Sequence, residues 1–259
     1  VYFISNVWPG KTFDEMEEAI KARKDSKLSA KVWNEMPYAY WDKWLDEERQ
    51  NHLYRVPAAG GEVEALTLGT GMQLPRTSPG TGEYDVSRDG KRLAFVADSR
   101  PEGVYPDRDV FLMDIGAKEA KNITADNEAP DGSPMFAPDG RTLAYTRQAI
   151  PGFYGDQVKL VLHDLRSGST TLLHENWDRS ASGLVWAPDS KGFYGAIDDA
   201  RRDQQQAGTG HRQDRSFPVQ PCDAQRFGER RLVGEKVEAV QAVGRVHQQH
   251  ADVIAVVPV

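Results

Sequence analysis

The sequence predicts an all-β protein, an incomplete β-propeller of about three and a half four-stranded blades with a helical insertion in the first blade. Three observations predict it: a repeat with a period of 50 residues, a tight Asp-containing turn in each repeat, and short apolar runs after each turn. Four short strands per unit of roughly 40–50 residues are typical of propeller blades. A β-sandwich with accidental periodicity is the alternative architecture.

Two markers define the repeat. Asp89, Asp139 and Asp189 lie 50 residues apart in the turns, and Asp114 and Asp164 end the next apolar run with the same spacing. Asp-Gly between apolar runs favours a β-hairpin, because glycine accepts a positive φ without a Cβ clash. The residues after each turn are therefore expected to form the core of their blade: Leu93 and Phe95, Leu143 and Tyr145, and Phe193.

The N-terminal residues predict an earlier, interrupted blade. Residues 1–6 resemble the run at 93–98, residues 52–56 resemble the run at 110–114, and residues 64–67 are expected to close the sheet.

An insertion, residues 8–50, separates the first two strands of that blade. Its first part is predicted to be helical, because Thr12 and Glu15 have the spacing of a capping box. Phe13, Met16 and Ile20 then fall on one helical face. Pro37 stops any helix before an aromatic group that consists of Tyr38, Tyr40, Trp41 and Trp44.

Charge and composition exclude several classes of protein. The formal net charge is −7, which disfavours a nucleic-acid-binding surface, and one cysteine allows neither an internal disulfide nor a cysteine-based zinc cluster. No apolar run approaches the roughly 20 residues that cross a bilayer. The sequence opens at Val1 without a visible signal peptide, although a missing N-terminus would hide one.

Composition changes near residue 200. All Trp and Tyr residues lie before it, and of the leucines only Leu232 lies beyond it, where Gln and Arg become frequent. We therefore divide the chain into a partial propeller, residues 1–199, and a non-propeller tail, residues 200–259. The tail is expected to be disordered or to arise from a shifted reading frame. The competing interpretation is a genuine extension, with a weak helix over 233–246 and a strand over 253–259.

One phrase of the sequence is more specific than the repeat. Residues 36–44, Met-Pro-Tyr-Ala-Tyr-Trp-Asp-Lys-Trp, run on to Asn-His-Leu-Tyr at 51–54. The phrase resembles the first-blade region of S9 (prolyl oligopeptidase) family serine peptidases, in particular the dipeptidyl-peptidase 5 and acylaminoacyl-peptidase-like subgroup. Residues 13–32 also match that subgroup, and residues 133–140 resemble its blade motif, which TolB-like propellers share.

The resemblance implies a propeller followed by an α/β-hydrolase domain with a Ser-Asp-His triad that cleaves short peptides, the propeller restricting access. It implies no cofactor, and it favours a periplasmic or secreted location over a cytoplasmic one. The sequence contains no Gly-x-Ser-x-Gly, the motif that places the nucleophile of such hydrolases. We therefore assign no catalytic, cofactor-binding or metal-binding residue, and we expect the chain to be inactive alone.

The expected function is that of an N-terminal propeller fragment that gates peptide access to a hydrolase domain missing here. Its partners are then the peptide substrate and that domain, with no nucleic acid and no membrane span. One alternative is a stand-alone TolB-like propeller that acts as a protein-binding module. Another is a truncated product without function.

Some residues permit a functional interpretation beside a structural one, and substrate-binding residues stay unassigned. Trp41 and Trp44 are candidates for a peptide-binding mouth, and the run Asp46-Glu47-Glu48 for attraction of a substrate amino terminus. His163 and His174 each precede an acid and are candidate general bases. Asn122-Ile123-Thr124 matches a glycosylation sequon. In each case the structural interpretation is favoured: packing, a solvated face, a strand-edge histidine and the closure of a blade.

Overall fold

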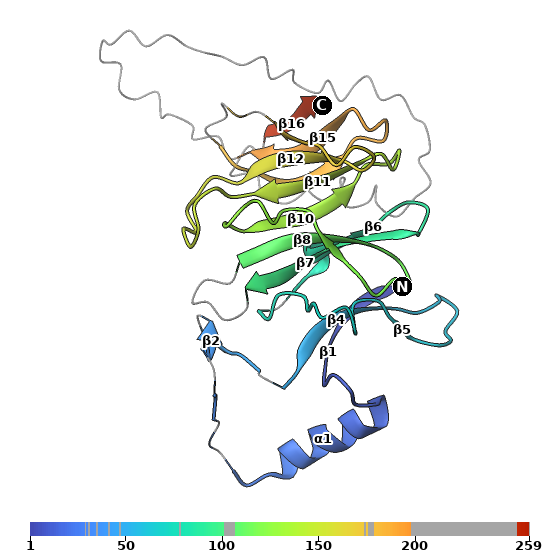
Figure 1. Ribbon diagram of the computed structural model, residues 1–259, viewed down its shortest axis with the longest axis vertical. Coiled ribbons are helices and arrows are strands. Elements are labelled where there is room, and N and C mark those ends of the chain that lie inside the picture. The colour runs from blue at the N-terminus through green and yellow to red at the C-terminus, as the bar shows by residue number, and fades with distance from the viewer. Residues whose placement is uncertain are drawn as a thin grey trace, which may run out of the picture. The chain divides into compact units, whose positions relative to one another are not determined.

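A computed structural model of the chain describes residues 1–197, apart from 29, 31, 35, 41, 47, 78, 101–106, 174 and 176–178, and also residues 253–258. The described residues are mostly β-strands in antiparallel sheets, with one α-helix (Figure 1). The chain divides into two compact units, Val1–Asn176 and Trp177–Val259.

The first sheet of the first unit is the interrupted one that the sequence predicts. Strand β1 (Tyr2–Val7) pairs with β4 (Gln50–Arg55), and β4 pairs with β5 (Glu64–Ala65). The register of β1 against β4 runs without a break from Tyr2↔Arg55 to Val7↔Gln50. The prediction of strands at 1–6, 52–56 and 64–67 is thus confirmed to within a few residues.

The insertion between β1 and β4 holds the helix α1 (Phe13–Asp25) and a small hairpin of β2 (Ala39–Tyr40) and β3 (Lys43–Trp44). The predicted capping box is present, because the Thr12 hydroxyl accepts from Glu15 N and the Glu15 carboxylate accepts from Thr12 N. The helix ends at Asp25, well before Pro37. Of its predicted apolar face, Met16 is buried, whereas Phe13 and Ile20 are more than half exposed.

Two four-stranded sheets follow in the first unit, and each has its strands in sequential antiparallel order. The second sheet consists of β6 (Tyr84–Val86), β7 (Arg92–Arg100), β8 (Asp107–Asp114) and β9 (Lys121–Asn122), with the short 3₁₀ turn η1 (Thr81–Glu83) before it. The third consists of β10 (Asp131–Phe136), β11 (Thr142–Arg147), β12 (Lys159–Asp164) and β13 (Thr170–Leu173).

The core of the first unit lies between these sheets. Leu93 and Phe95 on β7 pack in a cluster with Leu53 of the first sheet, whereas Ala94 packs with Leu143 and Tyr145 of the third. Strand β7 is therefore buried on both faces, which explains its continuous apolar run. All five residues expected in the core, including Phe193 of the second unit, are 0% exposed, so this prediction is confirmed.

The described part of the second unit is a three-stranded sheet of β14 (Ala181–Trp186), β15 (Gly192–Ile197) and β16 (Val253–Pro258). Strand β16 corresponds to the strand that the competing interpretation of the tail places over 253–259, and it pairs with β15 from Ile197↔Val253 to Gly192↔Pro258. It is rich in valine, a strong strand former, and it takes the free hydrogen-bonding edge of β15. Residues 198–252, on which the remainder of the tail prediction rests, lie outside the described residues.

Candidate functional site: a pocket and a carboxylate–arginine network

A group of buried charged side chains lies where β7 and β11 end and where β8 and β10 begin. Antiparallel pairing brings Asp98 opposite Arg108, and Asp131 opposite Arg147. Buried acids gather there, since Asp98, Asp107, Asp109 and Asp131 are each less than a tenth exposed. Buried charges are costly unless they are paired, so this end of the sheets is the first place to look for function.

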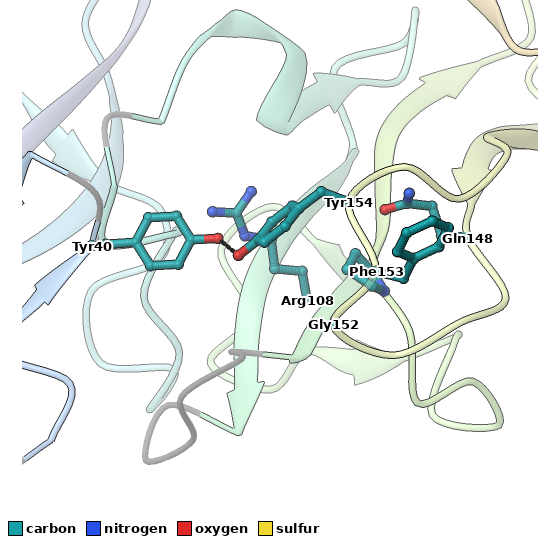
Figure 2. Close-up of a pocket in the computed structure, with 7 residues that line it drawn as sticks. Tyr40, Arg108, Gln148, Gly152, Phe153 and Tyr154 are labelled. Carbon is teal, nitrogen blue, oxygen red and sulfur yellow. Dashed lines mark hydrogen bonds between the residues drawn. The ribbon is translucent and has the colours of Figure 1, made fainter.

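A cavity of about 120 Å³ opens at this end (Figure 2). Arg108 of β8 and Gln148, which follows β11, supply its polar side chains, and Tyr40 of β2 reaches it from the insertion. The loop between β11 and β12 supplies the remaining aromatic walls, Phe153 and Tyr154, beside Gly152; Pro130 completes the lining. The hydroxyl groups of Tyr40 and Tyr154 contact each other across its mouth.

Arg108 contacts Thr77 and the carboxyl group of Asp98. Its Nη2 donates to Thr77 Oγ1 at 2.9 Å, and its Nε lies 3.8 Å from Asp98 Oδ1. The Asp98 side chain is 3% exposed and also lies 4.0 Å from Arg76 Nε. Burial raises the pKa of Asp98, while Arg108 and Arg76 act to lower it. Burial likewise raises the pKa of Glu83, which also interacts with Arg108.

A second pair, Asp131 and Arg147, lies beside the cavity. Arg147 Nε donates to the fully buried Asp131 carboxylate at 2.9 Å, and its two Nη atoms donate to Asp126. Burial raises the pKa of Asp131 to about 7, although hydrogen bonds from Asn127 and Arg147 act in the opposite direction. The guanidinium also lies over the Tyr145 ring, 5.6 Å from its centroid.

Trp44, one of the two tryptophans proposed for a peptide-binding mouth, lies on β3 of the insertion. Trp44 stacks on Trp33 with ring centroids 4.9 Å apart and on Tyr38 at 6.0 Å, and its side chain is 60% exposed. The Trp33 Nε1 donates to Leu45 O at 2.8 Å. Trp44 is therefore part of an aromatic stack within the insertion; Trp41 lies outside the described residues.

Two members of the acidic run are tied to the helix of the insertion. Arg23 donates to both Asp46 and Glu48, and Arg49 donates to Asp46 at 2.7 Å. Burial acts to raise the pKa of Asp46, but the hydrogen bonds from Arg49 and Arg23 outweigh it and hold the pKa at about 2. The guanidinium groups of Arg23 and Arg49 each lie over the Trp8 ring, 5.4 and 5.2 Å from its centroid, and Trp8 Nε1 donates to Glu48. These contacts anchor α1; Glu47 is outside the described residues.

The histidine candidate is not oriented by its neighbouring acid. The Asp164 Oδ1 accepts from the backbone of Arg166 and from Ser167, so this carboxylate organises the turn after β12. His163 is buried, burial lowers its pKa, and its Nδ1 makes no hydrogen bond within the described part of the chain. His163 lies near the end of β12, an interior strand of its sheet, where it is paired with Leu143 on one side and Thr170 on the other. His174 is not among the described residues.

The sequon residues close the second sheet. Thr124 Oγ1 donates to Asp109 at 2.8 Å and accepts from Val110 N at 3.0 Å, while Asn122 Nδ2 donates to the same carboxylate. Both side chains therefore take part in the hydrogen bonds that close the second sheet.

The residues that line the cavity were not singled out as functional from the sequence. Tyr40 entered only as part of an aromatic group, and Arg108, Gln148 and Tyr154 did not enter at all. One signal was present: Phe153 and Tyr154 are adjacent aromatic residues between two glycines in a loop, where apolar side chains often serve binding. Among the described residues, no group of three or more His, Cys, Asp or Glu side chains has an arrangement that could hold a metal ion. No helix in that part of the chain is long and apolar enough to span a membrane.

Comparison with known proteins identifies relatives of one kind. The chain is 25% identical over 175 residues to dipeptidyl-peptidase 5 of Porphyromonas gingivalis, covering 65% of this chain and 25% of the relative. It is 30% identical over 190 residues to the probable dipeptidyl-peptidase 5 of Emericella nidulans, covering 66% and 26%. For the probable dipeptidyl-peptidase 5 of Arthroderma benhamiae the identity is 31% over 201 residues, covering 69% and 27%.

No protein-family model matches the chain. A solved structure, the putative TolB from Agrobacterium tumefaciens, aligns with a TM-score of 0.41 and 18% identity over 57% of this chain and 49% of that chain, a likeness too weak to bear on the fold. The chain spans about a quarter of the length of the curated relatives that it matches. It is thus homologous to a portion of the S9-type dipeptidyl-peptidase 5 sequences, as the phrase at residues 36–54 implies.

Proposed function

We propose that residues 1–199 form part of a β-propeller that admits short peptides to the α/β-hydrolase domain of an S9-type serine peptidase of the dipeptidyl-peptidase 5 kind. The similarity to proteins named dipeptidyl-peptidase 5 over about two thirds of the chain carries this proposal. Under this proposal, the present chain forms part of the propeller through which peptides reach the hydrolase domain, and it supplies none of the residues that react with them.

The repeated turn supports the propeller architecture. Gly90, Gly140 and Ser190 each donate from the backbone N–H to the carbonyl three residues earlier, and Asp89, Asp139 and Asp189 each accept from the N–H two residues later. The same turn therefore recurs every 50 residues, as the repeating unit of a propeller does. In the first unit, sheets that pack face to face around such repeats are what neighbouring blades require.

The separation of binding and chemistry follows from the absent nucleophile motif. An α/β-hydrolase needs small residues around its nucleophile, and the 259-residue sequence has no Gly-x-Ser-x-Gly. The relatives are about four times as long as the stretch that they share with this chain, which leaves ample length for a hydrolase domain in them.

A chimaeric enzyme tests the proposal. The portion of Porphyromonas gingivalis dipeptidyl-peptidase 5 that aligns with this chain is replaced by the aligned stretch of this chain, which covers 65% of its length. We expect the chimaera to hydrolyse a dipeptidyl chromogenic substrate and to leave folded globular proteins intact. A matched chimaera that carries Phe95→Ala controls for the integrity of the grafted sheets, because Phe95 is fully buried.

Two results would count against the proposal. A folded, soluble chimaera without dipeptidyl hydrolysis means that the chain does not serve the hydrolase. This is the result expected of a stand-alone binding propeller. A chimaera that cleaves large proteins as fast as dipeptides means that the chain does not restrict access.

A further inference from the structure

We propose that the cavity between Tyr40, Arg108 and Tyr154 is a peptide subsite that binds one apolar amino-acid side chain of valine to leucine size together with an adjoining uncharged peptide group. The inference deepens the proposed function and rests on it only for the statement that peptides reach this part of the chain. No residue of the cavity belongs to a catalytic group.

The size of the cavity sets the size of the side chain. Its volume of about 120 Å³ is slightly below the roughly 150 Å³ of an engineered apolar cavity that binds benzene. A branched side chain of three or four carbon atoms fits that space, and an indole does not. The walls are largely aromatic, from Tyr40, Phe153 and Tyr154, so they offer apolar contact on several sides (Figure 2).

The cavity also presents one donor and one acceptor that are not used within the protein. Among the residues that the structure describes, Arg108 Nη1 makes no hydrogen bond, because Nη2 binds Thr77 and Nε faces Asp98. Gln148 donates through Nε2 to Asp156 O at 3.1 Å, which leaves its Oε1 as an acceptor. A peptide group carries a matching carbonyl and N–H, so it can satisfy both side chains at once.

Charge selects an uncharged ligand over an anion. The guanidinium of Arg108 is faced by the buried Asp98 carboxyl group and by Glu83, and Asp98 is also faced by Arg76. Two guanidinium groups and two carboxyl groups nearly balance each other. A guanidinium whose charge is already countered donates a hydrogen bond to a neutral carbonyl without attracting a free carboxylate strongly.

Two segments that are far apart in the sequence meet at the cavity. Tyr40 comes from the hairpin β2–β3 of the insertion, and Tyr154 comes from the loop between β11 and β12. Their hydroxyl contact crosses 114 positions of sequence, and Tyr154 is 58% exposed. Replacement of Tyr154 therefore removes a wall of the cavity without emptying the core of a sheet.

A direct titration tests the subsite without any hydrolase. The ¹⁵N-labelled 259-residue chain is titrated with N-acetyl-leucine amide, N-acetylglycine amide and N-acetyl-leucine, and shifts of the Gly152 amide and the Gln148 side-chain amide are followed. We expect saturable millimolar binding of N-acetyl-leucine amide, about tenfold tighter than that of N-acetylglycine amide, which lacks the side chain. The charged N-acetyl-leucine should bind no tighter than the amide.

Variants locate the binding. Tyr154→Ala and Arg108→Lys should each weaken binding of N-acetyl-leucine amide about tenfold. Arg166→Lys, at an exposed turn, should leave it within about twofold. Equal binding by wild type and Tyr154→Ala, tighter binding of the free acid, or no saturable shift of these amides would each overturn the subsite. The chimaera described above tests peptide access independently of this titration. If the chimaera is active but the titration shows no binding, the subsite proposal is wrong and the proposed function stands.

Discussion

Ser190 takes the place that glycine holds in the two preceding turns. Its φ is 62°, against 70° for both Gly90 and Gly140, so all three residues lie in the left-handed region. A residue with a Cβ loses roughly 1–2 kcal/mol there, whereas glycine does not. The third turn keeps the geometry because the hydrogen bonds at Ala187, Asp189 and Lys191 are the same as in the other two.

We expect Ser190→Gly to raise the free energy of unfolding by about 1 kcal/mol. The reciprocal change Gly90→Ser should lower it by a similar amount, and steric overlap adds nothing there because no atom lies within 4 Å of a Cβ at Gly90. Urea unfolding followed by circular dichroism measures both. If the two substitutions shift the midpoint in the same direction, backbone strain is not the cause.

His52 links stability to pH. It is 2% exposed, its Nδ1 lies 3.2 Å from Thr67 Oγ1 and its Nε2 lies 3.1 Å from Gln50 Oε1. Burial lowers its pKa from 6.5 to about 4. Between these values the unfolded chain binds a proton that the folded chain does not, so stability is complete above pH 6.5 and falls as the pH is lowered to about 4.

His52→Asn should remove this dependence. The difference in unfolding free energy between wild type and variant should change by roughly 3 kcal/mol between neutral pH and pH 4. The comparison at each pH cancels other groups, among them Asp131, whose raised pKa of about 7 makes its contribution larger at low pH. A difference that stays constant with pH would show that His52 titrates normally.

At the scale of the elements, the strand after each turn carries the core. Phe95 on β7 is fully buried and stacks on Phe111 of β8 with ring centroids 5.7 Å apart. Phe95→Ala should lower the free energy of unfolding by about 3–5 kcal/mol, the usual effect of emptying a buried aromatic site. Phe153→Ala is the matched control, because Phe153 is 54% exposed. A loss below about 1 kcal/mol for Phe95→Ala would place this strand outside the core.

A threonine two residues after each of the closing strands β5 and β9 completes the hydrogen bonds of its sheet. Thr67 Oγ1 accepts from Leu53 N at 2.9 Å, and Thr124 Oγ1 accepts from Val110 N at 3.0 Å; both threonines are 0% exposed. Thr67→Val and Thr124→Val keep the shape but leave these buried N–H groups unpaired, so each should lower the unfolding free energy by about 1–3 kcal/mol. Thr170→Val on β13, where the side chain is exposed, should change it by less than about 0.5 kcal/mol. Equal effects at all three positions would rule out the hydrogen bond as the cause.

Elements with a local or a repeating signal were predictable from the sequence, whereas the partner of the last strand was not. The Asp-containing turns and the capping box at Thr12 depend on neighbouring residues, so hairpins and helix start were found where expected. Strand β16 pairs with β15 from more than fifty positions away, and no local pattern specifies that partner. The exposure of Phe13 and Ile20 was likewise unpredictable, because a helical face shows periodicity whether or not something covers it.

At the scale of the whole molecule, the network of charged residues behind the cavity shows why the candidate site could not be predicted from the sequence. Arg76, Asp98 and Arg108 are ordinary charged residues in the sequence, and they become a buried group only when β7 pairs with β8 and the segment before η1 folds against them. Tyr40 joins from the insertion. Sites that are assembled from several loops leave no spacing motif, whereas relationship to the dipeptidyl-peptidases was visible in one continuous phrase at 36–54.

At the same scale, the chain should bind without catalysing. Its sequence has no nucleophile motif, and the acid beside His163 is engaged by the turn at Arg166 and Ser167. We therefore expect the purified 259-residue chain to hydrolyse dipeptidyl and acyl-aminoacyl chromogenic substrates no faster than buffer. Porphyromonas gingivalis dipeptidyl-peptidase 5, assayed in parallel with and without a serine-reactive phosphonate, shows that the assay detects the activity. Turnover that rises with the concentration of this chain and disappears with the phosphonate would mean that a reactive serine exists outside the expected motif, and the division between a gating part and a catalytic part would then be wrong.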